Sequence, residues 1–213
     1  NYVFFRSSNY SLLPAAGTRI HHGETIKGVV MANHAANMPT MTIANGGLGY
    51  FQPNNGVGYY IFQGLNFVSA GGSGAGAVLI LATPLNTGVN NAHHILVDRC
   101  WVHGDPVSGV GFGIQLHGQH IAVRDSLITD VFTGAAPRAV SGCGEPKGIL
   151  ATGPGPYEFF NNEIQGEGIN LFVGDNVATV DGTTANVTMR RNYIFKPDYS
   201  NPAITLYKEG FAN

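Results

Sequence analysis

Apolar and polar residues alternate in five eight-residue segments that share one pattern. The first, third and eighth positions of each segment are apolar, and these positions are separated by residues of mixed character. The segments span residues 60–67, 95–102, 121–128, 157–164 and 187–194. Alternation with a period of two predicts β-strands that turn one face toward a core. A weaker copy of the pattern, YVFFRSSN, stands near the N-terminus.

The sixth position of the pattern is small or polar instead of uniformly apolar. It is occupied in turn by Leu65, Cys100, Ser126, Asn162 and Asn192. Such a column is typical of an inward-facing residue at a sharp bend, where stacked Asn side chains bond to one another and to the turn backbone. Between the segments we expect further short strands, mostly entered through glycine, over residues 41–44, 77–81, 113–118, 148–153, 169–174 and 203–209.

The repeated register favours a solenoid over a β-sandwich. A sandwich also contains many short strands, but it gains nothing from repeating the same positions. In a solenoid each repeat stacks on the next and buries equivalent residues in rows. The 30 glycines, the 11% charged residues and the lack of a three-turn amphipathic helix favour an all-β chain. We predict one right-handed parallel β-helix domain over residues 1–213, with roughly six or seven rungs.

Charge and cysteine content exclude several classes of protein. A net charge of −2 gives no basic surface for nucleic acid, and no apolar run is long enough for a membrane span. We expect Cys100 to be a buried thiol and Cys143 a loop residue, with no disulfide between them. The histidine pairs at 21–22 and 93–94 do not predict zinc, because neighbouring strand residues point to opposite faces and no three-ligand spacing appears.

Several motifs give the chain a family resemblance. They are LPAAGTRI (13–20), HHILVDRCWVHGDP (93–106), HIAVRDSLITD (120–130), GPGPYEFFNNEIQGEG (153–168) and VTMRRNYIFKP (187–197). The chain resembles the pectate-lyase-like right-handed parallel β-helix superfamily, and within it bacterial proteins described by their β-helix repeats. It departs from that pattern over residues 135–148. The resemblance implies a secreted or cell-surface bacterial protein that interacts with polysaccharide.

The candidate chemistry lies between residues 98 and 138, where polar side chains gather on neighbouring repeats. A polysaccharide lyase needs a base and a charge-neutralising group, and a glycoside hydrolase needs two carboxylates. The candidate catalytic residues are His103, Asp105, Arg124, Asp125 and Asp130, and the candidate substrate-binding residues are Arg99, Trp101 and His117. Other aromatic residues that could stack on sugars if they face outward are Tyr50, Phe51, Tyr59, Phe112 and Phe132.

Each candidate also has a simpler interpretation. Asp and Arg side chains on adjacent strands, ~4.8 Å apart, form salt-bridge ladders as well as active sites. His103 begins HGDP, which is first of all a turn sequence, and Trp101 could pack beneath a loop. No cofactor is expected except calcium, for which Asp98, Asp125 and Asp130 are the candidate ligands.

Three functions therefore stay open on the sequence: a polysaccharide lyase or hydrolase, a non-catalytic binding or adhesive domain, and a structural segment of a larger surface protein or filament. Neither end of the chain shows an amphipathic capping helix. A β-helix with open ends exposes strand edges and core residues. We therefore expect further rungs, another domain or a second copy to cover the ends of this chain.

Overall fold

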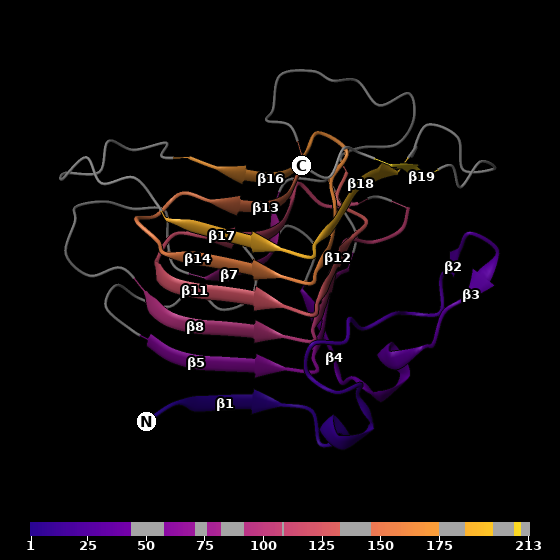
Figure 1. The fold of residues 1–213 in the computed structure, drawn as a ribbon, viewed down its shortest axis with the longest axis horizontal. Helices are drawn as coiled ribbons and strands as arrows, with labels where there is room; N and C mark the ends of the chain where they lie inside the picture. Colours follow the sequence, from indigo (N-terminus) through magenta and orange to yellow (C-terminus); the bar gives the residue numbers. More distant parts are fainter. Residues whose placement is uncertain are drawn as a thin grey trace.

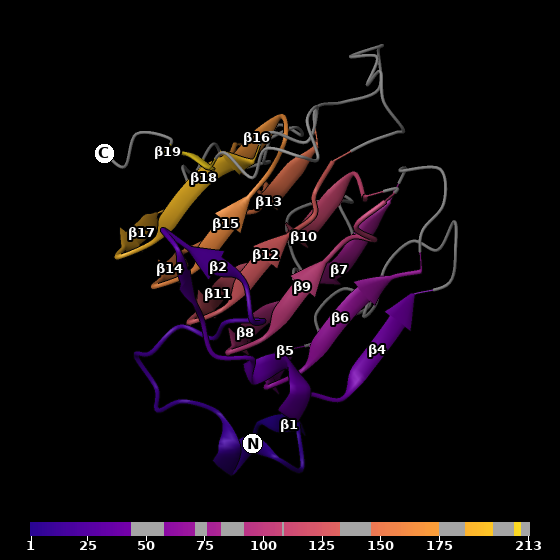
Figure 2. The ribbon, with the colours of Figure 1, turned by 90° about the vertical axis from the view of Figure 1, so that its right-hand side faces the viewer.

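The computed structural model describes residues 1–43, 58–70, 76–81, 92–107, 109–132, 146–174, 186–197 and 207–209. In these parts the chain is built from β-strands arranged in three larger sheets, together with one short hairpin and two 3-10 helices. Figure 1 shows the strands stacked one above another, and Figure 2, turned by 90°, shows the second sheet face on.

The first sheet holds six strands in the order β1-β5-β8-β11-β14-β17, all paired in parallel. Their bounds are β1 (Val3–Arg6), β5 (Gly58–Gln63), β8 (His93–Asp98), β11 (Gln119–Arg124), β14 (Tyr157–Phe160) and β17 (Val187–Arg190). β1 pairs in parallel with β5, so the weak N-terminal copy of the pattern is confirmed as a strand of this sheet. The pairing of Val3 with Tyr60 starts the copy one residue later than YVFFRSSN suggests.

The second sheet has the order β19-β18-β15-β12-β9-β6-β4, and the third has the order β16-β13-β10-β7. The second comprises β4 (Thr40–Ile43), β6 (Asn66–Ser69), β9 (Trp101–His103), β12 (Leu127–Thr129), β15 (Glu163–Gln165), β18 (Tyr193–Pro197) and β19 (Tyr207–Glu209). The third comprises β7 (Ala77–Leu81), β10 (Phe112–Leu116), β13 (Lys147–Ala151) and β16 (Ile169–Val173).

The chain visits these sheets in the same order in successive repeats. From β5 it passes to β6 in the second sheet and β7 in the third, and then returns to β8 beside β5. This all-β arrangement of stacked parallel strands is consistent with a parallel β-helix. Two expected strands differ from the prediction. β4 lies in the second sheet instead of joining the glycine-entered set, and β19 pairs antiparallel with β18.

The register confirms the alignment made from the sequence. The first position joins Tyr60, Ile95, Ile121, Tyr157 and Val187 across neighbouring strands. The third and eighth positions align in the same way, and most of these side chains form one apolar core. In the first and last described strands of the first sheet, third-position residues are exposed, with Phe5 at 36% and Met189 at 44%.

The bend between the first and second sheets repeats one backbone geometry. The fifth position adopts positive φ in every repeat, at Gly64, Arg99, Asp125, Asn161 and Arg191. Glycine enters this left-handed region freely, and Asn and Asp enter it more readily than other residues. The sixth position then turns inward, as predicted.

Side chains at the sixth position link successive bends. Ser126 accepts a hydrogen bond at Oγ from the amide of Cys100 (3.0 Å), and Asn162 accepts one at Oδ1 from the amide of Ser126 (3.0 Å). Asn192 accepts in turn from the amide of Asn162 (2.9 Å). Asn162 is fully buried and Asn192 is half-buried in the last described repeat. The predicted inward column is therefore present.

Candidate functional site

Residues 7–39, which we call the N-terminal strap, cover the outer face of the second sheet. The strap contains the 3-10 helices η1 (Tyr10–Leu12) and η2 (His34–Asn37) and the hairpin of β2 (Thr25–Ile26) and β3 (Val29–Val30). Leu13, Ile20 and Met38 pack with Leu127 of β12 in a second apolar cluster, against which Trp101 also lies. Figure 2 shows the strap, in indigo, in front of the sheet.

The strap is fastened to the bends between the sheets. The carboxylate of Asp125 accepts hydrogen bonds from the amide of Gly17 (2.7 Å) and from Nδ2 of Asn161 (2.7 Å). Arg19 reaches farther, and it donates to the carbonyls of Asn161 and Arg191 (3.1 Å each). Asp125, a predicted catalytic residue, is 2% exposed and holds the strap in place.

Asp98 and Arg99 form a second fastening point. Nε2 of Gln63 donates to Asp98 (2.9 Å), and Arg99 donates to both oxygens of the same carboxylate (3.0 and 2.6 Å). Arg99 also donates to the carbonyl of Pro14 (2.9 Å) and to the hydroxyl of Tyr10. Burial alone would lower the pKa of Arg99, but the hydrogen bond and charge of Asp98 raise it. Arg99, predicted to bind substrate, is buried beneath the strap.

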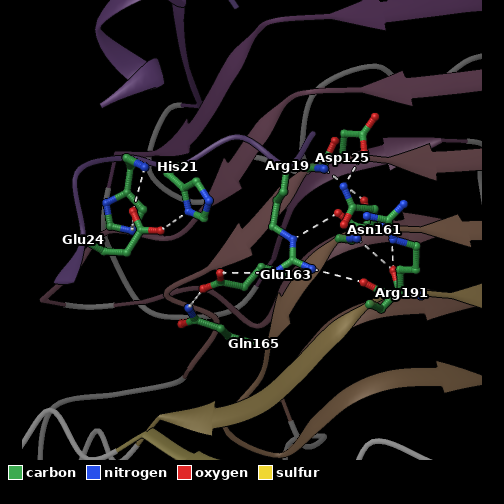
Figure 3. Close-up of polar contacts among 12 residues, drawn as sticks. Arg19, His21, Glu24, Asp125, Asn161, Glu163, Gln165 and Arg191 are labelled. Carbon is green, nitrogen blue, oxygen red and sulfur yellow. Dashed lines mark hydrogen bonds and ion pairs between the residues drawn. The ribbon is translucent and has the colours of Figure 1, made fainter. Parts of the chain in front are cut away.

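An imidazole and two carboxylates meet farther along the same interface. We call His21, Glu24 and Glu163 the His–Glu cluster. Nδ1 of His21 lies 2.5 Å from Oε1 of Glu24, whose other oxygen accepts from the amide of His22 (2.8 Å). Glu163 enters from β15 and is 2% exposed. Figure 3 shows the carboxylate of Glu163 on the side that faces His21 and Glu24, with Arg19 on the other side.

The two carboxylates of the cluster have opposite pKa shifts. Burial would raise the pKa of Glu24, but hydrogen bonds from His21 and from the amides of residues 22 and 24 outweigh it and lower the pKa to about 2. Burial raises the pKa of Glu163, and the negative charge of Glu24 adds to that effect. Gln165 donates to one oxygen of Glu163 (2.9 Å) and partly offsets the shift. Burial and the charge of Glu24 therefore outweigh the opposing effects of Gln165, Arg19 and His21 on the pKa of Glu163.

Trp101 is stacked between other residues of this interface. Its indole lies parallel to the rings of His22 (centroids 4.7 Å apart) and His103 (3.8 Å). Its Nε1 donates to Oγ1 of Thr129 (2.9 Å), which in turn donates to Asp130 (3.1 Å). Trp101 faces outward, as expected, and packs beneath the strap.

His103 and Asp130, both predicted to be catalytic, approach each other at this place. Nδ1 of His103 lies 4.0 Å from Oδ2 of Asp130 and donates to the carbonyl of Gly104 (2.8 Å). Burial lowers the pKa of His103 to about 4 and raises the pKa of Asp130. A neutral imidazole and a partly exposed carboxylate therefore stand side by side at the end of β12.

The remaining predicted residues lie apart from this interface. Arg124 donates to Glu158 (2.6 Å) on the outer face of the first sheet, where both side chains are more than 40% exposed. His117 is buried and hydrogen-bonds through Nδ1 to Thr152. Asp105 accepts from the amide of Val107 (3.0 Å) within its own turn. Tyr50, Phe51 and Cys143 lie outside the described residues.

The expected calcium ligands do not converge. Asp98 bonds to Arg99, Asp125 bonds to Gly17 and Asn161, and Asp130 bonds to Thr129. Asp98 and Asp125 hold different positions of the repeat, since Asp98 pairs in register with Arg124. Within the described ranges, the group whose spacing could hold a metal is instead His21, Glu24 and Glu163.

A row of rings is exposed at the start of the first sheet. Tyr2 meets Tyr59 edge to face (5.3 Å), Tyr59 stacks on His94 (4.8 Å), and His94 stacks on His120 (4.7 Å). Phe4 projects from β1 on the same face and is 53% exposed, compared with 46% for Tyr2 and 41% for Tyr59. We call these five residues the ring row.

The chain matches no family model, no curated protein and no solved structure. Along the described residues, no helix has both the length and the apolar character needed to cross a membrane. Its function must therefore be inferred from its own residues.

Sequence reasoning missed the His–Glu cluster because its members belong to different patterns. Glu163 occupies the seventh position of a repeat, whereas His21 and Glu24 lie in the strap, which repeats nothing. The signal that was available is the short spacing from His21 to Glu24, which lets the two side chains share one hydrogen bond. From the sequence alone, the histidine pair at 21–22 is interpreted as neighbours on one strand. In the structure His21 bonds to Glu24, whereas His22 stacks on Trp101.

Proposed function

We propose that this chain forms a right-handed parallel β-helix that binds polysaccharide outside the cell, on the outer face of its first sheet. The parallel sheets, visited in a fixed order, support the β-helix. The family resemblance supports the polysaccharide and the extracellular location. The ring row is the observation that carries the proposal for this protein.

The ring row suits a long, uncharged polymer better than a compact ligand. Its members follow one another across β1, β5, β8 and β11, so they extend along the stacking direction of the sheet. Aromatic rings bind the apolar faces of sugars, while their polar atoms and nearby side chains form hydrogen bonds. The sheet face beside the row carries the half-buried apolar residues Ile61 and Leu96. An exposed apolar strip of this kind marks an interaction surface.

We propose binding instead of cleavage because the acidic candidates are used within the protein. Asp125 holds the strap, Asp105 caps its own turn and Asp130 accepts from Thr129. Hydrolysis requires two carboxylates that both reach the sugar. On this proposal the rungs display the ring row on the first sheet, and the strap covers the outer face of the second sheet, where the buried charges lie.

Affinity electrophoresis through gels that contain neutral or uronate polysaccharides tests the proposal. We expect at least one polysaccharide to retard the wild-type chain. The variants Phe4→Ala and Tyr59→Asn should weaken that retardation about three- to tenfold each, the value of one aromatic contact. Asparagine is chosen at residue 59 because φ there is +67°, a conformation that Asn tolerates.

The matched control is Val107→Ala, which removes an apolar side chain that is 80% exposed in a turn after β9. It should bind polysaccharide like the wild type. Assays for new reducing ends and for unsaturated uronates, run on the same samples, should detect no turnover. The proposal is wrong if no polysaccharide retards the chain, or if the ring-row variants bind as well as Val107→Ala. Turnover of a bound polysaccharide would show that the chain is an enzyme and would contradict the proposed non-catalytic function.

A further inference from the structure

The His–Glu cluster joins two parts of the chain that are distant in sequence. His21 and Glu24 belong to the strap, and Glu163 is the first residue of β15. One ligand atom from each of the three residues lies within 4.8 Å of the other two. Ligand atoms around a tetrahedral zinc ion are roughly 3.3 Å apart, given metal–ligand bonds of about 2.0 Å. Side-chain movements on the order of 1 Å would therefore bring all three around one ion.

One oxygen of the cluster lacks a hydrogen-bond donor. Among the described residues, Oε2 of Glu163 is buried and accepts no hydrogen bond. The nearest cation, NH1 of Arg19, is 4.0 Å away, which is too long for a hydrogen bond. Native proteins rarely leave a buried carboxylate oxygen without a partner, because desolvating the charge is strongly unfavourable. Arg19 forms only this distant ion pair, and no described side chain donates a hydrogen bond to this oxygen, so a bound cation would complete its partners.

The other atoms of the cluster are already oriented. The amide of His22 holds one oxygen of Glu24 (2.8 Å), which leaves the second oxygen beside Nδ1 of His21. Gln165 likewise holds one oxygen of Glu163 and leaves the second without a donor. Outer partners of this kind fix the direction of metal-binding side chains.

We propose that His21, Glu24 and Glu163 bind a divalent transition-metal cation of the zinc type. One imidazole nitrogen and two carboxylate oxygens suit zinc, manganese, iron(II) or cobalt(II). Calcium is a poorer match, since it takes about six to eight oxygen ligands. The cation replaces the proton shared between His21 and Glu24. It also gives the second oxygen of Glu163 a close, positively charged partner.

The bound cation clips the strap to the second sheet. Its ligands come from both sides of the interface, so it binds the closed arrangement and not a chain in which the strap has left the sheet. Binding to the folded state alone raises stability in proportion to the logarithm of the cation concentration. The site lies on a different sheet from the ring row, so it is independent of polysaccharide binding.

Isothermal titration with zinc chloride, after treatment with a chelator, tests the site in the full chain. We expect one saturable zinc site, a rise in melting temperature with zinc concentration, and no comparable effect of calcium chloride. Cobalt(II) should give visible absorption bands of low coordination number. The variant Glu163→Gln should weaken zinc binding by at least about 100-fold. His21→Ala should do the same.

Glu158→Gln is the matched control, because Glu158 lies on β14 in the same repeat and is exposed on the first sheet. It should bind zinc like the wild type. Glu163→Gln keeps the size of the side chain, and without metal it should melt close to the wild type, since the buried carboxylate that it removes has only a 4.0 Å ion pair with Arg19. Two results overturn the proposal: a wild-type chain that shows no saturable zinc site, or a Glu163→Gln chain that binds zinc as tightly as the wild type.

Discussion

The amide of Gly17 donates a 2.7 Å hydrogen bond to Oδ2 of Asp125, 108 residues farther along the chain. Because Asp125 also accepts from Asn161, one buried carboxylate joins the strap to two successive bends. We predict that Asp125→Gly destabilises the protein by about 2–4 kcal/mol, since two hydrogen bonds to a charged group are lost. Glycine is chosen because it adopts the φ of +52° at residue 125 without steric strain. Chemical denaturation measures the loss.

The same change should release the strap. Limited proteolysis should cut Asp125→Gly within residues 13–24 faster than it cuts the wild type. The control Arg191→Gly alters the equivalent bend position, where φ is +58° and the side chain is exposed. Equal cleavage rates in the two variants would show that the carboxylate does not hold the strap.

A second prediction concerns the column of bend residues. Asn162 accepts from the amide of Ser126 and donates to the carbonyl of Val123 (2.8 Å), and its side chain is fully buried. Asn162→Ala removes both of these buried hydrogen bonds and should lower the free energy of unfolding by about 2–5 kcal/mol. Asn162→Ser should lose less, because Ser126 fills the equivalent place one repeat earlier and bonds similarly. Urea unfolding of the three proteins checks the order, which fails if Ala and Ser are equal.

The repeats were predictable from the sequence because stacking imposes one rule on many residues. The register of Ile95, Ile121 and Tyr157 follows from alternation alone, and the Asn162 column follows from its small side chains. Each rung must match its neighbours, so a weak pattern in one repeat can be aligned with the help of the other repeats. The left-handed conformation of the bend residues could not be predicted, because most of them are polar residues that also adopt ordinary negative φ values.

The strap could not be predicted, because its contacts are particular instead of periodic. Gly17 and Arg19 bond to residues more than 100 positions away, and Glu24 lies beside the equally distant Glu163, with no repeated spacing. The sequence around Asp125 does not distinguish a carboxylate that bonds to a covering segment from one that acts on a substrate. The burial of Asp125 decides between these roles. The strap contributes to that burial, and the repeated pattern does not predict the path of the strap.

A third prediction is a loss of stability in mild acid. Burial lowers the pKa of His117 from its usual 6.5 to about 4, so the folded protein keeps this ring neutral while the unfolded chain protonates it. Between those two pH values the unfolded state binds more protons, and stability therefore falls as pH falls from 6.5 to 4. The contribution is on the order of 2–3 kcal/mol. His103, with a pKa of about 4, acts in the same direction.

Denaturation at a series of pH values checks this slope. His117→Asn removes the titrating ring and should flatten the slope between pH 6.5 and 4. His120→Asn makes the same change at an exposed histidine and serves as the control variant. An unchanged slope in His117→Asn would assign the acid sensitivity to other groups.

The last prediction concerns the thiol in the core. Cys100 is fully buried, and burial raises the pKa of its thiol to about 12, so very little thiolate forms at neutral pH. Thiolate is the reactive form, and the closed bend also blocks access to it. In a Cys143→Ser chain we expect no labelling by iodoacetamide until denaturant unfolds the protein, and then one label per chain. Mass spectrometry across a denaturation series should place labelling at the unfolding midpoint. Labelling well below that midpoint would mean that the bends between the first and second sheets open locally, before the protein unfolds. The hydrogen bonds of the column formed by Cys100, Ser126 and Asn162 would then not be among the last to break.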